Sequence, residues 1–202
     1  MARAAKGLPE DYQPAGTLDF AKSRLTLLAL NVAGIVLLVL VVALLQAFLA
    51  ATRPDVGLHF VLRGREMLLA LAVAAALVVL VVVVHEFIHG AGFWLVTRER
   101  PEYRFRGYYV SAGAPEWYIP VGQYLWIGLA PLVVVTLGGL GLLRVVPPEA
   151  IPAVLWVVAF NAAGTVGDIA TVAWLCVQPR DSLVRDAGDA IALYRRTSTQ
   201  AH

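Results

Sequence analysis

Five consecutive residues, His85-Glu86-Phe87-Ile88-His89, have the types and the spacing of a metal site. On an α-helix, residues four apart share a face, so His85 and His89 can bind one ion through their imidazoles. The Glu86 carboxylate can then hold a water molecule beside that ion and act as its general base. The run lies inside a long apolar stretch, where an ionisable side chain costs roughly 2.5–3.5 kcal/mol. The pattern therefore predicts that these three groups serve a function.

A third metal ligand is predicted from membrane depth. The apolar segments at about 67–96 and 154–177 should cross the membrane in the same direction. At about 1.5 Å per residue, His85, His89 and Asp168 then lie roughly 10–16 Å from the cytoplasmic ends. Two nitrogens and one carboxylate leave a fourth position for water, which is the pattern of catalytic zinc. We therefore predict a Zn²⁺ site at these three residues.

Two loop carboxylates, Glu102 and Glu116, are alternative third ligands. Each would have to reach the histidines through a loop that folds back into the helices. Asp168 needs no such rearrangement and is therefore preferred.

Asn161 is a candidate catalytic residue, because it lies seven residues before Asp168 and shares its helical face. Its amide can orient a substrate carbonyl or donate to a developing oxyanion. A hydrogen bond between helices is the alternative role. Gly92 and Gly164 are small enough to let the two helices approach each other closely.

Composition indicates a small membrane protein. The chain has 202 residues, of which 59% are hydrophobic, and a net charge of only +2. These values fit a multi-pass protein in a lipid bilayer and give no reason to expect a nucleic-acid partner. Its one cysteine excludes a disulfide framework and a cysteine-based zinc site within one chain. No oligomeric state is predicted.

Four apolar segments are long enough to cross a bilayer, which needs about 20 helical residues. They run from about Leu25 to Ala51, Met67 to Val96, Tyr124 to Val146 and Val154 to Val177. Pro131 predicts a kink in the third segment, and Gly138, Gly139 and Gly141 allow close helix contact there. The expected fold class is therefore an all-α membrane protein with four transmembrane helices.

The basic residues predict the orientation. Most arginines and lysines lie in the N-terminal tail, in the loop after the second segment and in the C-terminal tail. By the positive-inside rule, both termini are cytoplasmic and the protein lies in the cell (inner) membrane.

Shorter elements are expected on the cytoplasmic side. The aromatic, alternating run Tyr103–Val110, followed by a turn at Ser111–Pro115, predicts a short β-hairpin between the second and third helices. Leu183, Ala187, Ile191 and Tyr194 recur near helical spacing and predict a C-terminal amphipathic helix. The expected division is a flexible tail at residues 1–21, a transmembrane metalloprotease-like domain at 22–178 and an amphipathic tail at 179–202.

At these residues the chain resembles a family of small multi-pass membrane proteins called putative zincin peptidases. The features that carry the resemblance are His85 to Gly90, the Ala130-Pro131 step, the Asn161-x-x-Gly164-x-x-Gly167-Asp168 run and the tail from Asp181 to Tyr194. More distantly the chain is similar to the site-2 protease group of intramembrane metalloproteases. It departs from that group because Ile169 follows Asp168 and no proline precedes it. The resemblance implies zinc ligands at His85, His89 and Asp168 and a general base at Glu86.

The functional hypothesis is zinc-dependent hydrolysis of peptide bonds at or within the cytoplasmic leaflet. Zinc would polarise the scissile carbonyl and activate water, and Glu86 would pass the water's proton to the leaving amine. A membrane or membrane-associated protein would be the substrate, held as an added strand by the predicted hairpin. The alternatives are a non-catalytic, zinc-stabilised membrane scaffold and a small transporter or proton relay.

Overall fold

A computed structural model describes residues 3–56, 64–105, 110–188 and 190–197. The chain divides into two compact units. The first contains residues 1–29, 86–130 and 167–202, and the second contains residues 30–85 and 131–166. The chain passes from one unit to the other at residues 29/30, 85/86, 130/131 and 166/167. Each of these four boundaries falls inside a helix.

Five α-helices lie in the described residues: α1 (Arg24–Thr52), α2 (Arg65–Thr97), α3 (Val121–Leu143), α4 (Ile151–Gly164) and α5 (Val166–Cys176). Three of them, α1 to α3, are long and apolar enough to cross a membrane. The predicted fourth helix is not continuous. The segment Pro148–Gly164 and α5 are bent by 43° and would together form a fourth span.

A threonine, Thr165, lies at the bend between α4 and α5. Both its N–H and its hydroxyl bond to the carbonyl of Asn161, at 3.0 Å and 2.7 Å. A threonine hydroxyl that bonds back to the preceding turn tends to bend a helix. Asp168 consequently lies in the first turn of a new helix rather than in the middle of a long one.

The prediction of an all-α protein is wrong. Five strands form an antiparallel sheet in the order β1-β5-β6-β7-β2. The strands are β1 (Ala5–Lys6), β2 (Tyr12–Leu18), β5 (Trp117–Pro120), β6 (Leu183–Asp186) and β7 (Ile191–Arg196). The expected flexible N-terminal tail thus contains β1 and β2, and the expected C-terminal amphipathic helix is replaced by β6 and β7. The boundaries predicted at residues 21 and 178 stay predictions.

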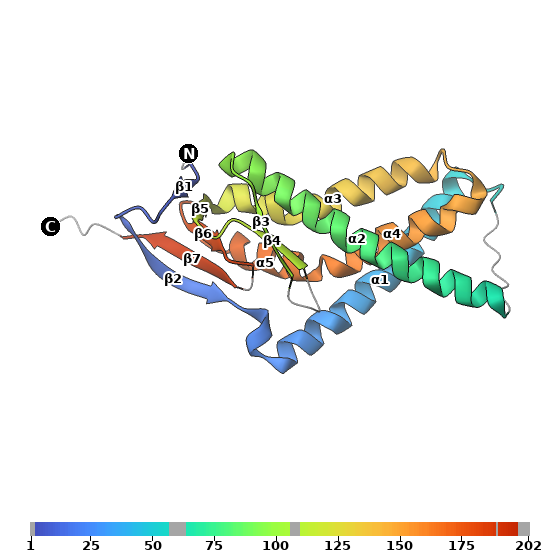
Figure 1. Ribbon diagram of the computed structural model, residues 1–202, viewed down its shortest axis with the longest axis horizontal. Helices are drawn as coiled ribbons and strands as arrows, with labels where there is room; N and C mark the ends of the chain where they lie inside the picture. Colours follow the sequence, from blue (N-terminus) through green and yellow to red (C-terminus); the bar gives the residue numbers. More distant parts are fainter. Residues whose placement is uncertain (1–2, 57–63, 106–109, 189, 198–202) are drawn as a thin grey trace. The chain divides into compact units, whose positions relative to one another are not determined.

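Strand β2 pairs with β7 at the edge of the sheet (Figure 1). Its Pro14 and Gly16 suggest a loop, but an edge strand tolerates both residues at an irregularity. The pairing does shift between Pro14 and Gly16. A Cβ on Gly16 would lie 3.7 Å from the indole of Trp174 on α5, so the strand passes close to that helix.

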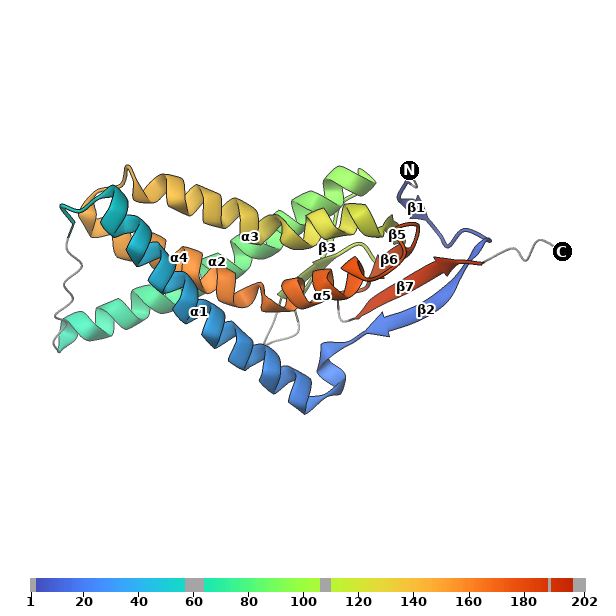
Figure 2. The ribbon, with the colours of Figure 1, turned by 180° about the vertical axis from the view of Figure 1, so that it is seen from behind.

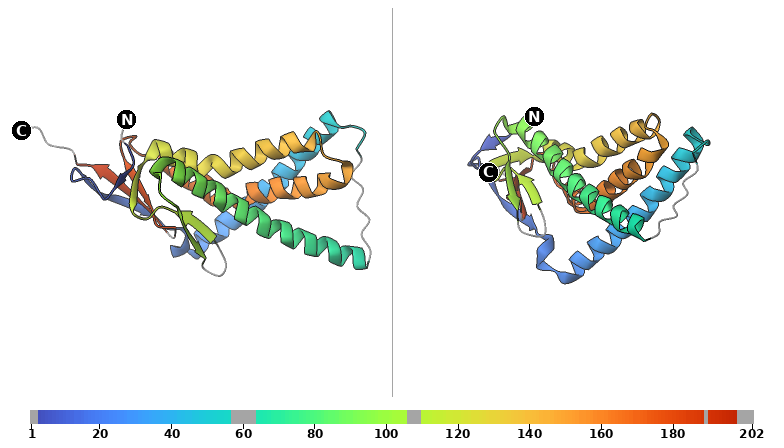
Figure 3. Two further views of the ribbon diagram at one scale, coloured as in Figure 1. Left: turned by 45° about the horizontal axis from the view of Figure 1, so that its top comes forward. Right: turned by 45° about the vertical axis from the view of Figure 1, so that its right-hand side comes forward.

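Two further strands, β3 (Glu102–Phe105) and β4 (Val110–Gly113), form a separate antiparallel pair. A hairpin was expected in this loop, with a turn at Ser111–Pro115. In the structure Ser111 to Gly113 belong instead to strand β4. Residues 106–109 of the predicted run lie outside the described residues. The pair lies along the last turns of α2 (Figure 3).

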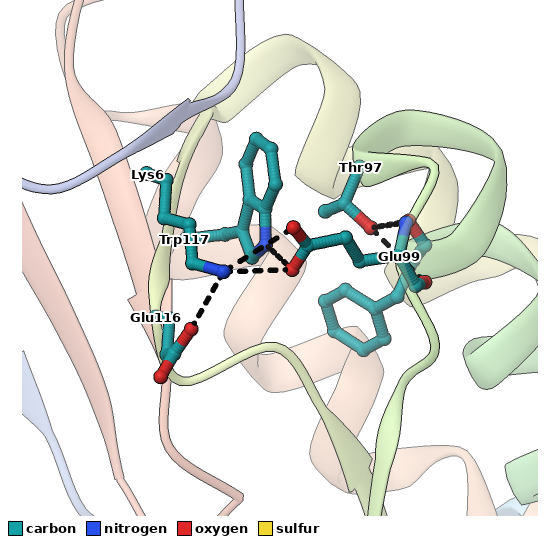
Figure 4. Close-up of polar contacts among 6 residues, drawn as sticks. Lys6, Thr97, Glu99, Glu116 and Trp117 are labelled. Atoms are coloured by element: carbon teal, nitrogen blue, oxygen red, sulfur yellow. Dashed lines mark hydrogen bonds and ion pairs between the residues drawn. The ribbon is translucent and has the colours of Figure 1, made fainter.

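A polar cluster joins β1 to the loop after α2 (Figure 4). The ammonium of Lys6 lies 3.2 Å from a Glu99 carboxylate oxygen and 3.0 Å from one of Glu116, and Glu99 also accepts the Trp117 indole N–H. Its two carboxylate partners, Glu116 first, raise the pKa of Lys6. All three charged side chains are about half exposed, so these pairs orient β1 but contribute little stability.

In the second unit, the later half of α3 and α4 lie side by side (Figure 2). Gly139 of α3 faces Val158 of α4 so closely that an added Cβ would overlap the valine side chain. A Cβ added to Gly138 or to Gly141 would have no neighbouring atom within 4 Å. Of the three glycines expected to allow helix contact, only Gly139 therefore does so within this structure.

Replacing Gly139 with alanine is expected to destabilise the protein relative to Gly138→Ala. The stiff side chain of Val158 cannot move aside cheaply, and overpacking costs about 1–3 kcal/mol. Gly138→Ala should instead gain up to about 1 kcal/mol of helix propensity. Thermal unfolding of both variants in detergent measures the difference, and equal midpoints would contradict the packing described for α3 and α4.

Candidate metal centre

The histidines stand one turn apart on α2, and both side chains are largely buried. The boundary between the two units passes between His85 and Glu86. Since α2 is continuous there, the helix itself fixes His85 relative to His89. Helical spacing thus places both imidazoles on one face, as the sequence predicted.

His89 is held through both ring nitrogens. Its Nδ1 lies 3.0 Å from the backbone carbonyl oxygen of Ile127, on α3. A carbonyl oxygen can only accept, so Nδ1 carries a proton, and in the neutral imidazole Nε2 then has the lone pair. Nε2 lies 3.5 Å from a carboxylate oxygen of Asp168. In this arrangement His89 Nε2 and the Asp168 carboxylate could ligate the same metal ion.

His85 is held in the same tautomer by an amide. Its Nδ1 lies 3.1 Å from Oδ1 of Asn161, and Nδ2 of Asn161 donates to the carbonyl of Pro131 at 3.1 Å. That carbonyl accepts only, which fixes the amide so that its oxygen faces His85. The Nδ1 of His85 therefore donates, and in the neutral imidazole its Nε2 carries the lone pair that could bind a metal. Asn161 is thus hydrogen-bonded between helices, the alternative role considered for it.

The donor set fits zinc. His85, His89 and Asp168 form one group of side chains whose types could hold a metal ion. At tetrahedral zinc, with ligands about 2.0–2.2 Å from the ion, neighbouring ligand atoms are roughly 3.3 Å apart. The 3.5 Å between His89 and Asp168 matches this spacing. Two imidazoles and one carboxylate with a remaining position for water form the catalytic rather than the structural zinc pattern.

Glu86 faces a pocket of about 200 Å³ in the first unit. One carboxylate oxygen accepts the backbone N–H of Ala112, on β4, at 2.7 Å. This N–H is therefore directed away from β3 and toward α2. His89, Asp168 and Ala112 line the same pocket, so the Glu86 carboxylate and two candidate metal ligands share it.

One comparison with known proteins identifies a family. A family model described as putative zincin peptidase matches residues 78–183, just over half of the chain. The chain belongs to this family. No curated protein and no solved structure matches it.

The zincin family implies zinc as the metal, and the matched segment contains the whole His85–His89 run, Asn161 and Asp168. The other carboxylates considered as ligands lie elsewhere. Glu102 pairs with Arg104, and Glu116 pairs with Lys6. Neither lines the pocket. In the described part of the chain, Asp168 is the carboxylate grouped with the histidines; its ligation stays a prediction.

Sequence reasoning missed two residues of this zincin pocket, Tyr124 and Asp186. The Tyr124 hydroxyl donates to one carboxylate oxygen of Asp186 at 2.5 Å, and the other oxygen accepts the N–H of Gly188 at 2.7 Å. Asp186 lies on β6, in a segment that was expected to be helical, so no pattern related it to the histidines. A correct strand assignment after Pro179 was the signal needed.

Burial raises the pKa of Asp186, although the hydrogen bonds from Tyr124 and Gly188 oppose the shift. A carboxyl group with a raised pKa stabilises the fold below its unfolded pKa of about 3.9 and loses that contribution as pH rises through its folded pKa. The contribution of Asp186 to stability should therefore be lost as the pH rises above about 4.

The Asp186→Asn variant should lack this pH dependence. Thermal unfolding of both proteins in detergent between pH 4 and 8 would measure it. The wild type should lose stability relative to Asp186→Asn as the pH rises. A difference between wild type and Asp186→Asn that is independent of pH would contradict the assignment.

Proposed function

We propose that this chain is a zinc-dependent membrane metallopeptidase that hydrolyses peptide bonds. One observation carries the proposal: the Glu86 carboxylate shares a pocket with His89 and Asp168, two members of a donor set that fits catalytic zinc. Membership of the putative zincin peptidase family supports it. When bound, zinc supplies a Lewis acid that polarises the scissile carbonyl and lowers the pKa of a water molecule.

Glu86 moves the proton. Its carboxylate takes a proton from the attacking water and passes it to the nitrogen of the leaving amine. The hydroxide oxygen bonds to the carbonyl carbon, the C–N bond breaks, and a carboxylate and an amine result. The Ala112 N–H at 2.7 Å holds the Glu86 side chain on the pocket side of α2.

Strand β4 offers a place for the substrate. β3 and β4 form a two-stranded sheet, and the second edge of β4 carries the Ala112 N–H toward Glu86. Ser111 and Ala112 line the pocket. An extended peptide that runs along this edge would pass beside the candidate metal ligands. Extended backbone is what a peptidase must hold, because a helical substrate hides its carbonyls in its own hydrogen bonds.

The proposed location is the cell (inner) membrane, with both termini and the pocket on the cytoplasmic side. Three helices apolar enough to cross a membrane support membrane association. Termini on one side require an even number of crossings, which is met if α4 and α5 form one bent span. The arginine-rich loop and tails favour the cytoplasmic side. A membrane or membrane-associated protein is then the proposed substrate.

Fusions at the two termini test this topology. Green fluorescent protein attached at either end should fluoresce, because it folds in the cytoplasm. Alkaline phosphatase attached at either end should be inactive, because it needs an oxidising compartment. Active phosphatase at one terminus only would show that the termini lie on opposite sides, and the chain would then cross the membrane an odd number of times.

Two substitutions separate metal binding from catalysis. Glu86→Gln should keep the zinc stoichiometry of the wild type and lose cleavage by several orders of magnitude, because the base is gone. Asp168→Ala should lose zinc, whereas Glu102→Ala should not. Metal content after purification in detergent, together with cleavage of a membrane protein substrate, measures both effects.

The outcomes also distinguish the alternatives. Full cleavage by Glu86→Gln would exclude the mechanism. Stoichiometric zinc without turnover on membrane substrates would favour a zinc-stabilised scaffold. Ion flux in vesicles without bound zinc would favour a transporter or proton relay. The distant likeness to site-2 proteases is part of this proposal and gains weight only with intramembrane cleavage.

A further inference from the structure

Pro131 interrupts the hydrogen-bond ladder of α3 at one place. In an α-helix the N–H of residue 131 would bond to the carbonyl of residue 127. Proline has no N–H, and its ring pushes against the carbonyl four residues earlier. The carbonyl of Ile127 therefore loses its partner within the helix. The structure shows what occupies it: the Nδ1–H of His89, at 3.0 Å.

The carbonyl of Pro131 serves the other histidine. It accepts Nδ2 of Asn161 at 3.1 Å, and this bond turns Oδ1 of Asn161 toward Nδ1 of His85. A carbonyl oxygen has two lone pairs, so it can accept this bond besides one from its own helix. Pro131 thus acts on both histidines. Its missing N–H leaves the Ile127 carbonyl for His89, and its own carbonyl orients Asn161 toward His85.

These bonds decide which ring nitrogen is available. A histidine that donates from Nδ1 presents its lone pair at Nε2. Both histidine side chains are buried, and a buried N–H without an acceptor is costly. The carbonyl released by the proline supplies the acceptor for His89.

We propose that Pro131 is a positioning residue for the metal centre, which holds His85 and His89 in the tautomer that directs both Nε2 atoms at one divalent ion. The inference rests on the proposed metal site and is independent of peptidase activity. It assigns the Ala130-Pro131 step a chemical reason: the proline is needed for the carbonyl that it leaves unbonded.

Replacing Pro131 with alanine tests the inference, because alanine restores the N–H and closes the ladder on Ile127. Zinc affinity should fall about 10–100-fold, the usual effect of losing a bond that orients a metal ligand. The unfolding temperature of the metal-free protein should stay the same or rise, because alanine favours a helix interior. Competition with a fluorescent chelator in detergent measures the affinity.

Pro152→Ala is the matched control. Pro152 lies in the first turn of α4, where a helix tolerates proline because the N–H there has no intrahelical partner. This variant should bind zinc as the wild type does. Wild-type affinity in Pro131→Ala, or an equal loss in Pro152→Ala, would overturn the proposal.

A backbone ester separates the missing donor from the proline ring. Lactate at position 131, introduced by nonsense suppression, has the side chain of alanine but no N–H. It should retain zinc affinity near that of the wild type. An affinity as low as that of Pro131→Ala would show that the missing donor is not the cause.

A spectroscopic measurement needs neither zinc nor a substrate. In metal-free protein with ¹⁵N-labelled histidine, long-range ¹H–¹⁵N spectra should show His85 and His89 protonated at Nδ1. Pro131→Ala should give a mixture of tautomers at His89, and Asn161→Ala should do so at His85. Unchanged tautomers in both variants would overturn the inference, even if the wild type bound no zinc and the proposed function failed separately.

Discussion

The hydrogen bond from His89 to the carbonyl of Ile127 satisfies the constraint on which the site depends. A buried polar group that lacks a hydrogen-bond partner costs free energy, so the buried imidazole N–H groups need acceptors. Backbone carbonyls of a helix are normally occupied by the helix itself. An acceptor for His89 exists because Pro131 breaks the ladder at one place. Asn161 solves the same problem for His85.

Two irregular helix positions add to what the continuous helix α2 contributes to the site. Pro131 releases a carbonyl in α3, and Thr165 ends α4 so that Asp168 begins a new helix. A carboxylate in a first turn lies near the positive end of the helix dipole. Both irregularities lie within the segment that matches the zincin family.

The site could be predicted from the sequence better than the fold. His85 and His89 are related by helical spacing alone, and Asp168 by counting residues from a membrane boundary; neither needs knowledge of the tertiary structure. The sheet depends on pairing between distant residues, such as Tyr12 with Arg196. Nothing local in β2 indicates its partner, and Pro14 and Gly16 argue for a loop. In the last segment, the spacing of Leu183, Ile191 and Tyr194 fits a helix, but these residues lie on two short paired strands instead.

The interleaved order of the chain has a consequence for biosynthesis. The pocket takes its walls from the N-terminal segment, the end of α2, the hairpin, the start of α3, α5 and the last two strands. A ribosome therefore completes His89 long before it makes Asp168 and Ile191. Until then His89 lacks its Asp168 neighbour, and the pocket lacks the residues that α5, β6 and β7 contribute. All the residues that line the pocket are therefore present only after the last strand has been made.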